Sequence, residues 1–262
     1  MAERTIVLIS NDRVLKTFPD VDGVCRPVGY RAESVSGTEI AALSHLSRFS
    51  PDLIPHVYWL GENSTSCEKV DIGNPNQFPQ IVDLLERVQA VPIEEASLPV
   101  ARPDDYFREA KSKLDDLASN GSFLGITKQE RDEITTKYES GLSSLEIFDS
   151  VFVHGDFQNR HIGDKGDQPL LIDWEQARIG SPLEDPVFYA LRHPTRGRLI
   201  KDYLRRKYSS NPLERVALPT AYETMEIDRL IHIWHWNTFK RSGLVAAAKS
   251  VYARAAIGMH LQ

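Results

Sequence analysis

Short apolar runs dominate the N-terminal part of the chain and predict a group of β-strands. Residues 5–10 and 13–18 are β-rich and are separated by an Asn-Asp pair, which is typical of a tight hairpin. Strand-like runs follow at 53–61 and 67–72, and the polar segment 62–66 between them is typical of a turn. We therefore expect the N-terminal part of the protein to be rich in β-structure.

Helical spacing of apolar residues first appears at 36–46, where Ser36 is placed to cap the predicted helix. Another predicted helix begins at Thr127, and Glu130 completes a capping-box pattern with it. The remaining helices are expected at 79–90, 104–119, 127–148, from 186 onward and at 221–241. The pattern thus indicates a chain that is β-rich at first and mostly helical afterwards.

Two apolar runs in the second half of the chain each lead into a carboxylate. Residues 151–153 precede an H-G-D tripeptide that ends at Asp156, and residues 170–172 precede a D-W-E tripeptide that begins at Asp173. Short apolar runs between Gly, Asp and Pro predict buried strands. A carboxylate at the end of such a strand stands on a rigid support, which suits proton transfer and metal binding.

Three elements in this order, H-G-D at 154–156, I-D-W at 172–174 and G-S-P-L-E-D at 180–185, resemble the aminoglycoside phosphotransferase and choline kinase family. The resemblance implies an α+β, protein-kinase-like bilobal fold. It implies a small N-lobe over residues 1–73, with nucleotide roof and hinge, and a helical C-lobe over 74–262, with catalytic loop and acceptor site. Such proteins transfer the γ-phosphate of a nucleoside triphosphate to a hydroxyl of a small molecule.

The resemblance assigns roles to two carboxylates and an ion pair. Asp156 would accept the proton of a substrate hydroxyl or orient that hydroxyl, and Asp173 would bind Mg²⁺, or Mn²⁺, at the phosphates of ATP or GTP. Lys16 would hold the α- and β-phosphates, and Glu39 would orient Lys16. Without the resemblance, Lys16 would be a solvated edge lysine and Glu39 a favourable charge at a helix N-terminus.

Further residues receive supporting roles from the same resemblance. The backbone at Glu68 to Val70 would form the hinge that binds the edge of the nucleotide base. His154 and Asp185 would support the catalytic loop by hydrogen bonds. Glu175 would face the cleft and meet a cationic acceptor such as an aminoglycoside or an amino alcohol; the alternative is a surface acid.

The chain departs from the family pattern at two places. His161 stands where the family has a metal-binding Asn, and imidazole suits softer ions than Mg²⁺. His161 would ligate a metal through nitrogen, or orient Asp156 in a site with one metal, or mark a site that has lost catalysis. In addition, about one strand fits before Lys16 and no Gly-rich loop precedes it, so we expect a truncated roof and weaker nucleotide binding.

Composition argues against nucleic acid and membrane as binding partners of the protein. The net charge of −6 disfavours a nucleic-acid-binding face, and no apolar run reaches the length of a membrane span. Cys25 and Cys67 form no C-x-x-C pair, which favours neither a disulfide framework nor a zinc site, and we expect a cytoplasmic protein with a small-molecule acceptor.

Two other functions remain open at this point. The first is a catalytically weak or inactive kinase-like protein that binds a ligand, which the truncated roof and His161 favour. The second is a metal-dependent hydrolase, whose metal site would be built from His154, Asp156, His161 and Asp173. The hydrolase leaves Lys16 and Glu39 without a role, and retention of the kinase-like residues argues against the inactive protein.

Overall fold

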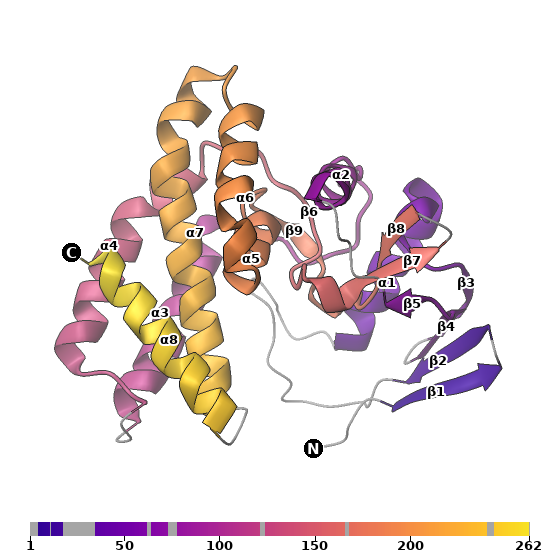
Figure 1. Ribbon diagram of the computed structural model, residues 1–262, viewed down its shortest axis with the longest axis horizontal. Helices are drawn as coiled ribbons and strands as arrows, with labels where there is room; N and C mark the ends of the chain where they lie inside the picture. Colours follow the sequence, from indigo (N-terminus) through magenta and orange to yellow (C-terminus); the bar gives the residue numbers. More distant parts are fainter. Residues whose placement is uncertain are drawn as a thin grey trace. The chain divides into compact units, whose positions relative to one another are not determined.

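The computed structural model describes residues 5–10, 12–17, 35–61, 64–72, 78–120, 124–165, 168–239 and 244–261 (Figure 1). The chain divides into two compact units, each built from two segments. The first unit comprises Met1–Ala101 and Ser150–Tyr203, and the second comprises Arg102–Asp149 and Leu204–Gln262. The predicted lobes, 1–73 and 74–262, follow the kinase pattern rather than these units, and that division stays a prediction.

The largest sheet of the first unit is antiparallel and carries Lys16. Its strands are β1 (Thr5–Ser10), β2 (Arg13–Thr17), β3 (Val57–Leu60) and β4 (Ser64–Glu68), in the spatial order β1-β2-β4-β3. The predicted N-terminal hairpin is confirmed, because β1 pairs with β2 in antiparallel register. Among the described residues, β1 is the strand that precedes Lys16 in the chain, and it lies at the edge of the sheet.

The polar turn predicted at 62–66 is wrong for its second half. Residues 64–66 belong to β4, which lies between β2 and β3, and Thr65 pairs with Lys16 on one side and Leu60 on the other. Pairing on both edges satisfies the backbone groups of this strand, so its Ser and Thr side chains do not prevent it from forming. The strand predicted at 67–72 is also divided, since β5 (Asp71–Ile72) joins a different sheet.

Helix α1 (Val35–Phe49) carries Glu39 and packs on the first sheet and on the turn that follows Asp173. It begins at Val35, one residue before Ser36, and the capping predicted for the Ser36 side chain lies outside the side chains that the structure describes. Its buried side includes Leu43 and Leu46 of the predicted helical spacing, together with Ala42, while Ile40 is half-buried. Because this side also contains Glu39, at 4% exposure, the carboxylate is held inside the unit.

Two small sheets hold the central motifs. β5 pairs with β7 (Ile162–Lys165), which pairs with β8 (Gln168–Leu171), and β6 (Val151–Val153) pairs with β9 (Arg178–Gly180). All pairs are antiparallel. The H-G-D tripeptide leaves the end of β6, and the D-W-E tripeptide follows β8, as the two apolar runs predicted.

Helices and short 3₁₀ turns complete the first unit. α2 (Phe78–Gln89) buries Ile81, Leu84, Leu85 and Val88, the apolar side of the predicted helix. The other elements are α5 (Glu184–Arg192), most of α6 (Pro194–Lys207), and the 3₁₀ turns η1 (Pro51–Leu53), η2 (Asn159–His161) and η3 (Trp174–Gln176). η2 and η3 are the elements that shape the site.

The second unit contains α3 (Pro103–Ser119), α4 (Lys128–Leu145), α7 (Pro212–Phe239) and α8 (Leu244–His260). The predicted capping box is confirmed, since Thr127 and Glu130 bond to each other's backbone N–H. α7 begins before the predicted residue 221 and runs through Pro219, because its buried side packs on α3, α4 and α8. Within the described residues, no helix has both the length and the apolar character of a membrane span.

Candidate active site

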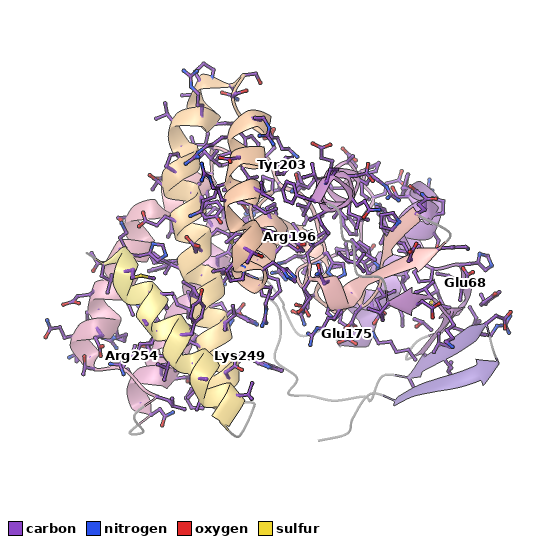
Figure 2. All side chains as sticks on the ribbon, viewed as in Figure 1. Glu68, Glu175, Arg196, Tyr203, Lys249 and Arg254 are labelled. Carbon is purple, nitrogen blue, oxygen red and sulfur yellow. The ribbon has the colours of Figure 1, made fainter. Side chains whose placement is uncertain are left out.

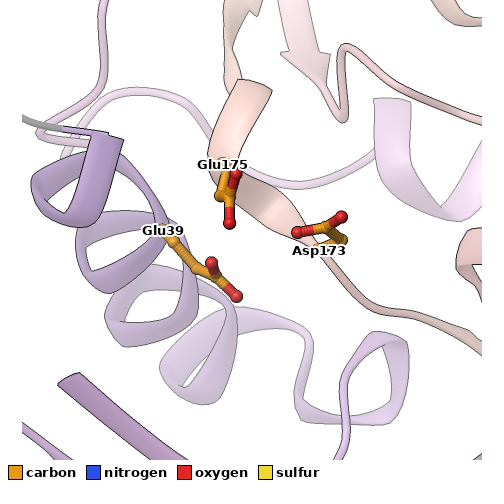
Figure 3. A group of neighbouring side chains, drawn as sticks. All are labelled: Glu39, Asp173 and Glu175. Atoms are coloured by element: carbon orange, nitrogen blue, oxygen red, sulfur yellow. The ribbon is translucent and has the colours of Figure 1, made fainter. Parts of the chain in front are cut away.

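The ammonium of Lys16 contacts three carboxylates. Its Nζ lies 2.8 Å from Oδ1 of Asp173 and 2.8 Å from Oε1 of Glu175, and it also contacts Oε2 of Glu39. Figure 3 shows the three acids converging from α1 and from the turn after β8, and Figure 2 labels Glu175 on that turn. The acids lie close enough to share a metal ion, and in this structure they share the ammonium. Glu175, which was predicted to meet the acceptor, forms an ion pair with Lys16 in this structure.

Burial sets the protonation behaviour of Glu39. It raises the pKa of the Glu39 carboxyl to about 7, against the lowering effect of the Lys16 charge. The charges of Glu175 and Asp173 also raise this pKa. The ionised form of Glu39 is stabilised inside the unit by the charge of Lys16. The ion pair of Lys16 and Glu39 joins β2 to α1.

The backbone turn at Asp173 aims its two carboxylate oxygens in different directions. Asp173 has φ 68° and ψ 58°, and among the described residues it is the one non-glycine residue with positive φ. This left-handed conformation costs about 1–2 kcal/mol for an ordinary residue, and Asp tolerates it better than most. Oδ1 faces Lys16, while Oδ2 lies 3.2 Å from Nε2 of His161.

Asp185, in the first turn of α5, anchors the loop that follows β6. Its two carboxylate oxygens accept the backbone N–H groups of His154, at 2.8 Å, and Gly155, at 2.9 Å. Gly155 has φ 82°, and a Cβ at this position would collide with the backbone oxygen of Gln176. The loop therefore needs both a glycine and a buried acceptor at these positions.

His154 ties the loop to the strand that leads into Asp173. Its Nδ1 accepts the N–H of Asp156 at 3.2 Å, and its Nε2 donates to the carbonyl of Ile172 at 2.9 Å. This pattern fixes the neutral ring with its proton on Nε2. Burial lowers the pKa of His154 to about 4, and the nearby His161 lowers it as well. His154 is thus a neutral buttress that links the segments bearing Asp156 and Asp173.

Both carboxylate oxygens of Asp156 receive donors from the same loop. The amide of Gln158 donates to Oδ1, and Nη2 of Arg160 donates to Oδ2 at 3.2 Å. The Asp156 side chain is 22% exposed, so it stays accessible at the surface of the unit. A carboxylate in this position can accept a proton from a hydroxyl that replaces one of these donors.

The ring of His161 lies between the two acids. Its Nδ1 lies 2.9 Å from the backbone oxygen of Asp156, and because a carbonyl can only accept, Nδ1 carries the proton in this bond. In the neutral ring, Nε2 then presents its lone pair to Oδ2 of Asp173. The distance of 3.2 Å suits a hydrogen bond from a protonated ring to Asp173, and it also suits two ligands of a shared cation when the ring is neutral.

The predicted hinge, Glu68 to Val70, begins at the last residue of β4. The N–H of Glu68 bonds to the carbonyl of His56, and the N–H of Lys69 bonds to the carbonyl of Asp12, so both are engaged in the sheet. The side chain of Glu68 pairs with Lys165 at 2.6 Å. A base edge would therefore have to use backbone groups of this segment other than these two N–H groups, such as those of Val70.

Sequence reasoning missed two sets of supporting residues. Gln158 and Arg160 hold Asp156, and no motif marked them, since they occupy unspecified positions of the family pattern. Arg178 forms an ion pair with Glu184 in which Nε and Oε2 are 3.1 Å apart, and both side chains are fully buried. Arg178 lies in β9 and Glu184 begins α5, and a spacing of six positions between two different elements gives no periodic signal, so this pair could be found only in three dimensions.

Comparison with known proteins places this geometry in a family. The sequence profile described as the phosphotransferase enzyme family matches residues 72–218, more than half of the chain. A search of curated protein sequences found none that matches the chain. The profile match does not include Lys16 and Glu39, which the fold brings to Asp173.

Solved structures share the fold at low sequence identity. The GDP complex of aminoglycoside 2′-phosphotransferase-IIIa is 15% identical with a TM-score of 0.64, and the match covers 100% of this chain and 91% of that one. An ethanolamine kinase from Plasmodium vivax is 12% identical with a TM-score of 0.64 (97% and 82% covered). The choline kinase LicA from Streptococcus pneumoniae is 12% identical with a TM-score of 0.61 (98% and 89% covered).

These neighbours confirm the predicted α+β, protein-kinase-like fold, with small sheets in the N-terminal part and mostly helices in the C-terminal part. The profile match confirms the family that the three sequence motifs indicated. Taken with the site, it establishes that the chain belongs to the phosphotransferase enzyme family.

Proposed function

We propose that this protein is a small-molecule kinase that transfers the γ-phosphate of ATP or GTP to a hydroxyl of a small acceptor. The observation that carries the proposal is the contact of Lys16 with both Glu39 and Asp173. It joins a phosphate-binding cation, the acid that orients it and a candidate metal ligand. Matching solved structures are described as a GDP complex and as ADP-bound, which supports a nucleoside phosphate as donor.

The residues present suit a divalent cation beside Asp173. The carboxylate supplies a hard oxygen and His161 supplies the Nε2 lone pair, 3.2 Å apart. When bound, a divalent ion neutralises charge on the nucleotide phosphates. Lys16 then holds the α- and β-phosphates, Glu39 keeps Lys16 in place, and the segment from Glu68 to Val70 meets the base.

The transfer itself needs one proton acceptor. The oxygen of the acceptor hydroxyl forms a bond to the γ-phosphorus, and the bond from that phosphorus to the oxygen bridging to the β-phosphate breaks. The nucleoside diphosphate leaves with the electron pair, and Asp156 takes the hydroxyl proton or orients the hydroxyl. His154 and Asp185 keep the loop that bears Asp156 in register with Asp173.

The acceptor we propose is a small and cationic alcohol, of the aminoglycoside or amino-alcohol type. Neighbours described as aminoglycoside, ethanolamine and choline kinases support this class. The candidate site is also rich in carboxylates, with Glu39, Asp173 and Glu175 around a single ammonium. Glu175 becomes available to a cationic group once Lys16 turns to the phosphates.

A thermal-shift titration with ATP and GTP, each with Mg²⁺ or Mn²⁺, tests the proposal. A ligand at 100 times its dissociation constant adds about 2.7 kcal/mol to the stability, which is easily measured. We expect a metal-dependent shift in the wild type that Asp173→Asn abolishes and that Asp164→Asn, an exposed acid on β7, leaves unchanged. Phosphorylation of aminoglycosides and amino alcohols is then measured with labelled nucleotide.

The outcome also separates the proposal from its main alternative. Nucleotide binding without phosphorylation of any alcohol would favour a kinase-like protein that binds a ligand without turnover. No shift with any nucleotide would contradict the kinase assignment itself.

A further inference from the structure

Both carboxylate oxygens of Asp156 are engaged in this structure by donors from its own loop. Gln158 donates to Oδ1, and Arg160 donates from Nη2 to Oδ2 at 3.2 Å. An incoming hydroxyl that approaches Oδ2 of Asp156 competes with Arg160 for the lone pairs of that oxygen. In the described conformation, the proton acceptor of the site proposed above is thus engaged by donors of its own loop.

Arg160 is the donor that can leave without disturbing the loop. Its side chain is 58% exposed, whereas Gln158 is buried at 8% exposure. An exposed ion pair of this kind contributes only about 0–1 kcal/mol, so it opens readily. The backbone around Arg160 stays fixed in η2, because the N–H of His161 bonds to the carbonyl of Gln158 at 2.9 Å. The guanidinium can thus swing while the loop keeps its shape.

The released guanidinium would supply a charge that the site needs. Lys16 faces three carboxylates, so its single positive charge is already shared among Glu39, Asp173 and Glu175. The phosphoryl group in transfer carries negative charge on its equatorial oxygens. A planar guanidinium with paired N–H donors matches two such oxygens better than an ammonium does.

We propose that Arg160 is a phosphoryl-positioning residue that rests on Asp156 in the empty site and moves to the transferred phosphoryl group when the acceptor hydroxyl binds. The inference rests on the proposed function. One movement of a side chain then does two things: it frees Asp156 for the hydroxyl proton, and it brings a second cation to the reacting phosphate. The bonds made and broken are those of the transfer given above, and Arg160 neither gains nor loses a proton.

Aluminium fluoride with a nucleoside diphosphate tests this inference without a known acceptor, because it imitates the phosphoryl group in transfer. Affinities of ADP and GDP are measured by calorimetry with and without aluminium fluoride, for wild type, Arg160→Gln and Arg160→Lys. We expect Arg160→Gln to bind the diphosphate alone as the wild type does and to lose about 10- to 100-fold in affinity for the aluminium fluoride complex. Arg160→Lys should lie between the two.

Arg48→Gln is the matched control. Arg48 is an arginine of the same unit whose side chain is 67% exposed and pairs with the exposed Glu95 at 2.6 Å. Its substitution removes the same charge from the surface and should change neither affinity. A loss in Arg160→Gln that the Arg48 variant does not share is then local to the candidate site.

The result that would overturn the inference is an Arg160→Gln variant that binds the aluminium fluoride complex as tightly as the wild type while diphosphate binding is retained. A wild type that binds no diphosphate would instead contradict the proposed function, and the inference with it. Once an acceptor is found, Arg160→Gln should lower kcat about 100-fold without raising the KM of the acceptor. A rise in kcat would show that Arg160 only obstructs Asp156, and would also overturn the inference.

Discussion

The ammonium of Lys16 lies 2.8 Å from Oδ1 of Asp173, although 157 positions separate the two residues in the chain. Both belong to the first unit, together with α1, which adds Glu39 to the same ammonium. Folding of this one unit therefore assembles all the charged residues of the candidate site. The contact also shows that the stability of the unit and the chemistry of the site depend on the same side chains.

Lys16→Met should destabilise the protein, because it leaves three carboxylates near one another without their cation. The side chains of Lys16 and Glu39 are 13% and 6% exposed, so the lost charge is poorly replaced by water. Breaking a pair of this kind by removing one partner costs about 3–5 kcal/mol. Urea denaturation of the variant and the wild type measures the difference in free energy of unfolding.

The double variant Lys16→Met/Glu39→Gln is the control for that experiment. It removes the most buried of the three charges, and it should recover a large part of the lost stability. If Lys16→Met alone unfolds at the same urea concentration as the wild type, the three contacts of Lys16 do not stabilise the unit.

Asp185→Ala should destabilise the catalytic loop, because two buried N–H groups lose their acceptor. Those of His154 and Gly155 bond to the Asp185 carboxylate, and Asp185 is 2% exposed. Each unsatisfied buried donor costs about 1–3 kcal/mol. We expect a total loss of about 2–6 kcal/mol in chemical denaturation, since two donors are left unsatisfied.

Asp185→Asn separates the two hydrogen bonds. Its amide oxygen can still accept one N–H, so the loss of stability should fall between those of the wild type and Asp185→Ala. Asp149→Ala, a change of an exposed Asp, should have no measurable effect. Equal stability of Asp185→Ala and the wild type would contradict the anchoring role.

Much of this site could be predicted from local pattern. The Asn-Asp pair between two β-rich runs is a turn signal that needs no tertiary information, and it placed Lys16 on the second strand of a hairpin. Helical spacing placed Glu39 on the helix that follows. Apolar runs before Asp156 and Asp173 predicted strands that deliver both acids. Such features follow from turn chemistry and periodicity, which short segments contain.

The remaining features depend on groups that meet only after folding. The sequence does not reveal that Asp173 adopts a left-handed turn, and this turn decides that one oxygen faces Lys16 and the other His161. The contact of Glu175 with Lys16 is likewise a tertiary one that the sequence did not indicate, and the meeting of Glu175 with an acceptor stays a prediction. The strand at Ser64 was missed because its side chains are polar, while its pairing on both edges is a tertiary property.

Stability should rise with pH between about 4 and 6.5 in part because of His154. Burial lowers the pKa of His154 to about 4 from its ordinary 6.5, so in this window the unfolded chain binds more protons than the folded protein. The contribution is fully present above 6.5 and is lost as the pH falls to 4. It amounts to at most about 3 kcal/mol.

His154→Gln is the variant that isolates this effect, because it removes the titrating ring. Glu39 contributes with the opposite sign, since its raised pKa makes stability fall as the pH rises from 4.5 to about 7. The quantity to compare is therefore the slope of unfolding free energy against pH in wild type and variant. We expect a less positive slope in His154→Gln, and identical slopes would contradict a neutral, buried His154.

His161→Asn should shift the metal preference of the site from Mn²⁺ toward Mg²⁺. Nδ1 of His161 donates to the carbonyl of Asp156, so in the neutral ring Nε2 offers a lone pair beside Oδ2 of Asp173. A nitrogen ligand favours Mn²⁺ over Mg²⁺, whereas an amide oxygen suits the harder ion. We expect the ratio of Mn²⁺ to Mg²⁺ affinity, measured by calorimetry with nucleotide present, to fall by about tenfold or more in the variant.

A spectroscopic measurement decides whether nitrogen binds the metal at all. Electron spin echo envelope modulation of bound Mn²⁺ detects a directly coordinated imidazole nitrogen, and His161→Asn and His161→Leu should both lose that signal. The two variants differ in the ligand that they offer to the metal, because Asn supplies an amide oxygen and Leu supplies none. Only His161→Asn should therefore retain tight Mg²⁺ binding. A wild type that binds Mn²⁺ without nitrogen coupling would instead assign His161 to holding Asp156, the contact that its Nδ1 already makes.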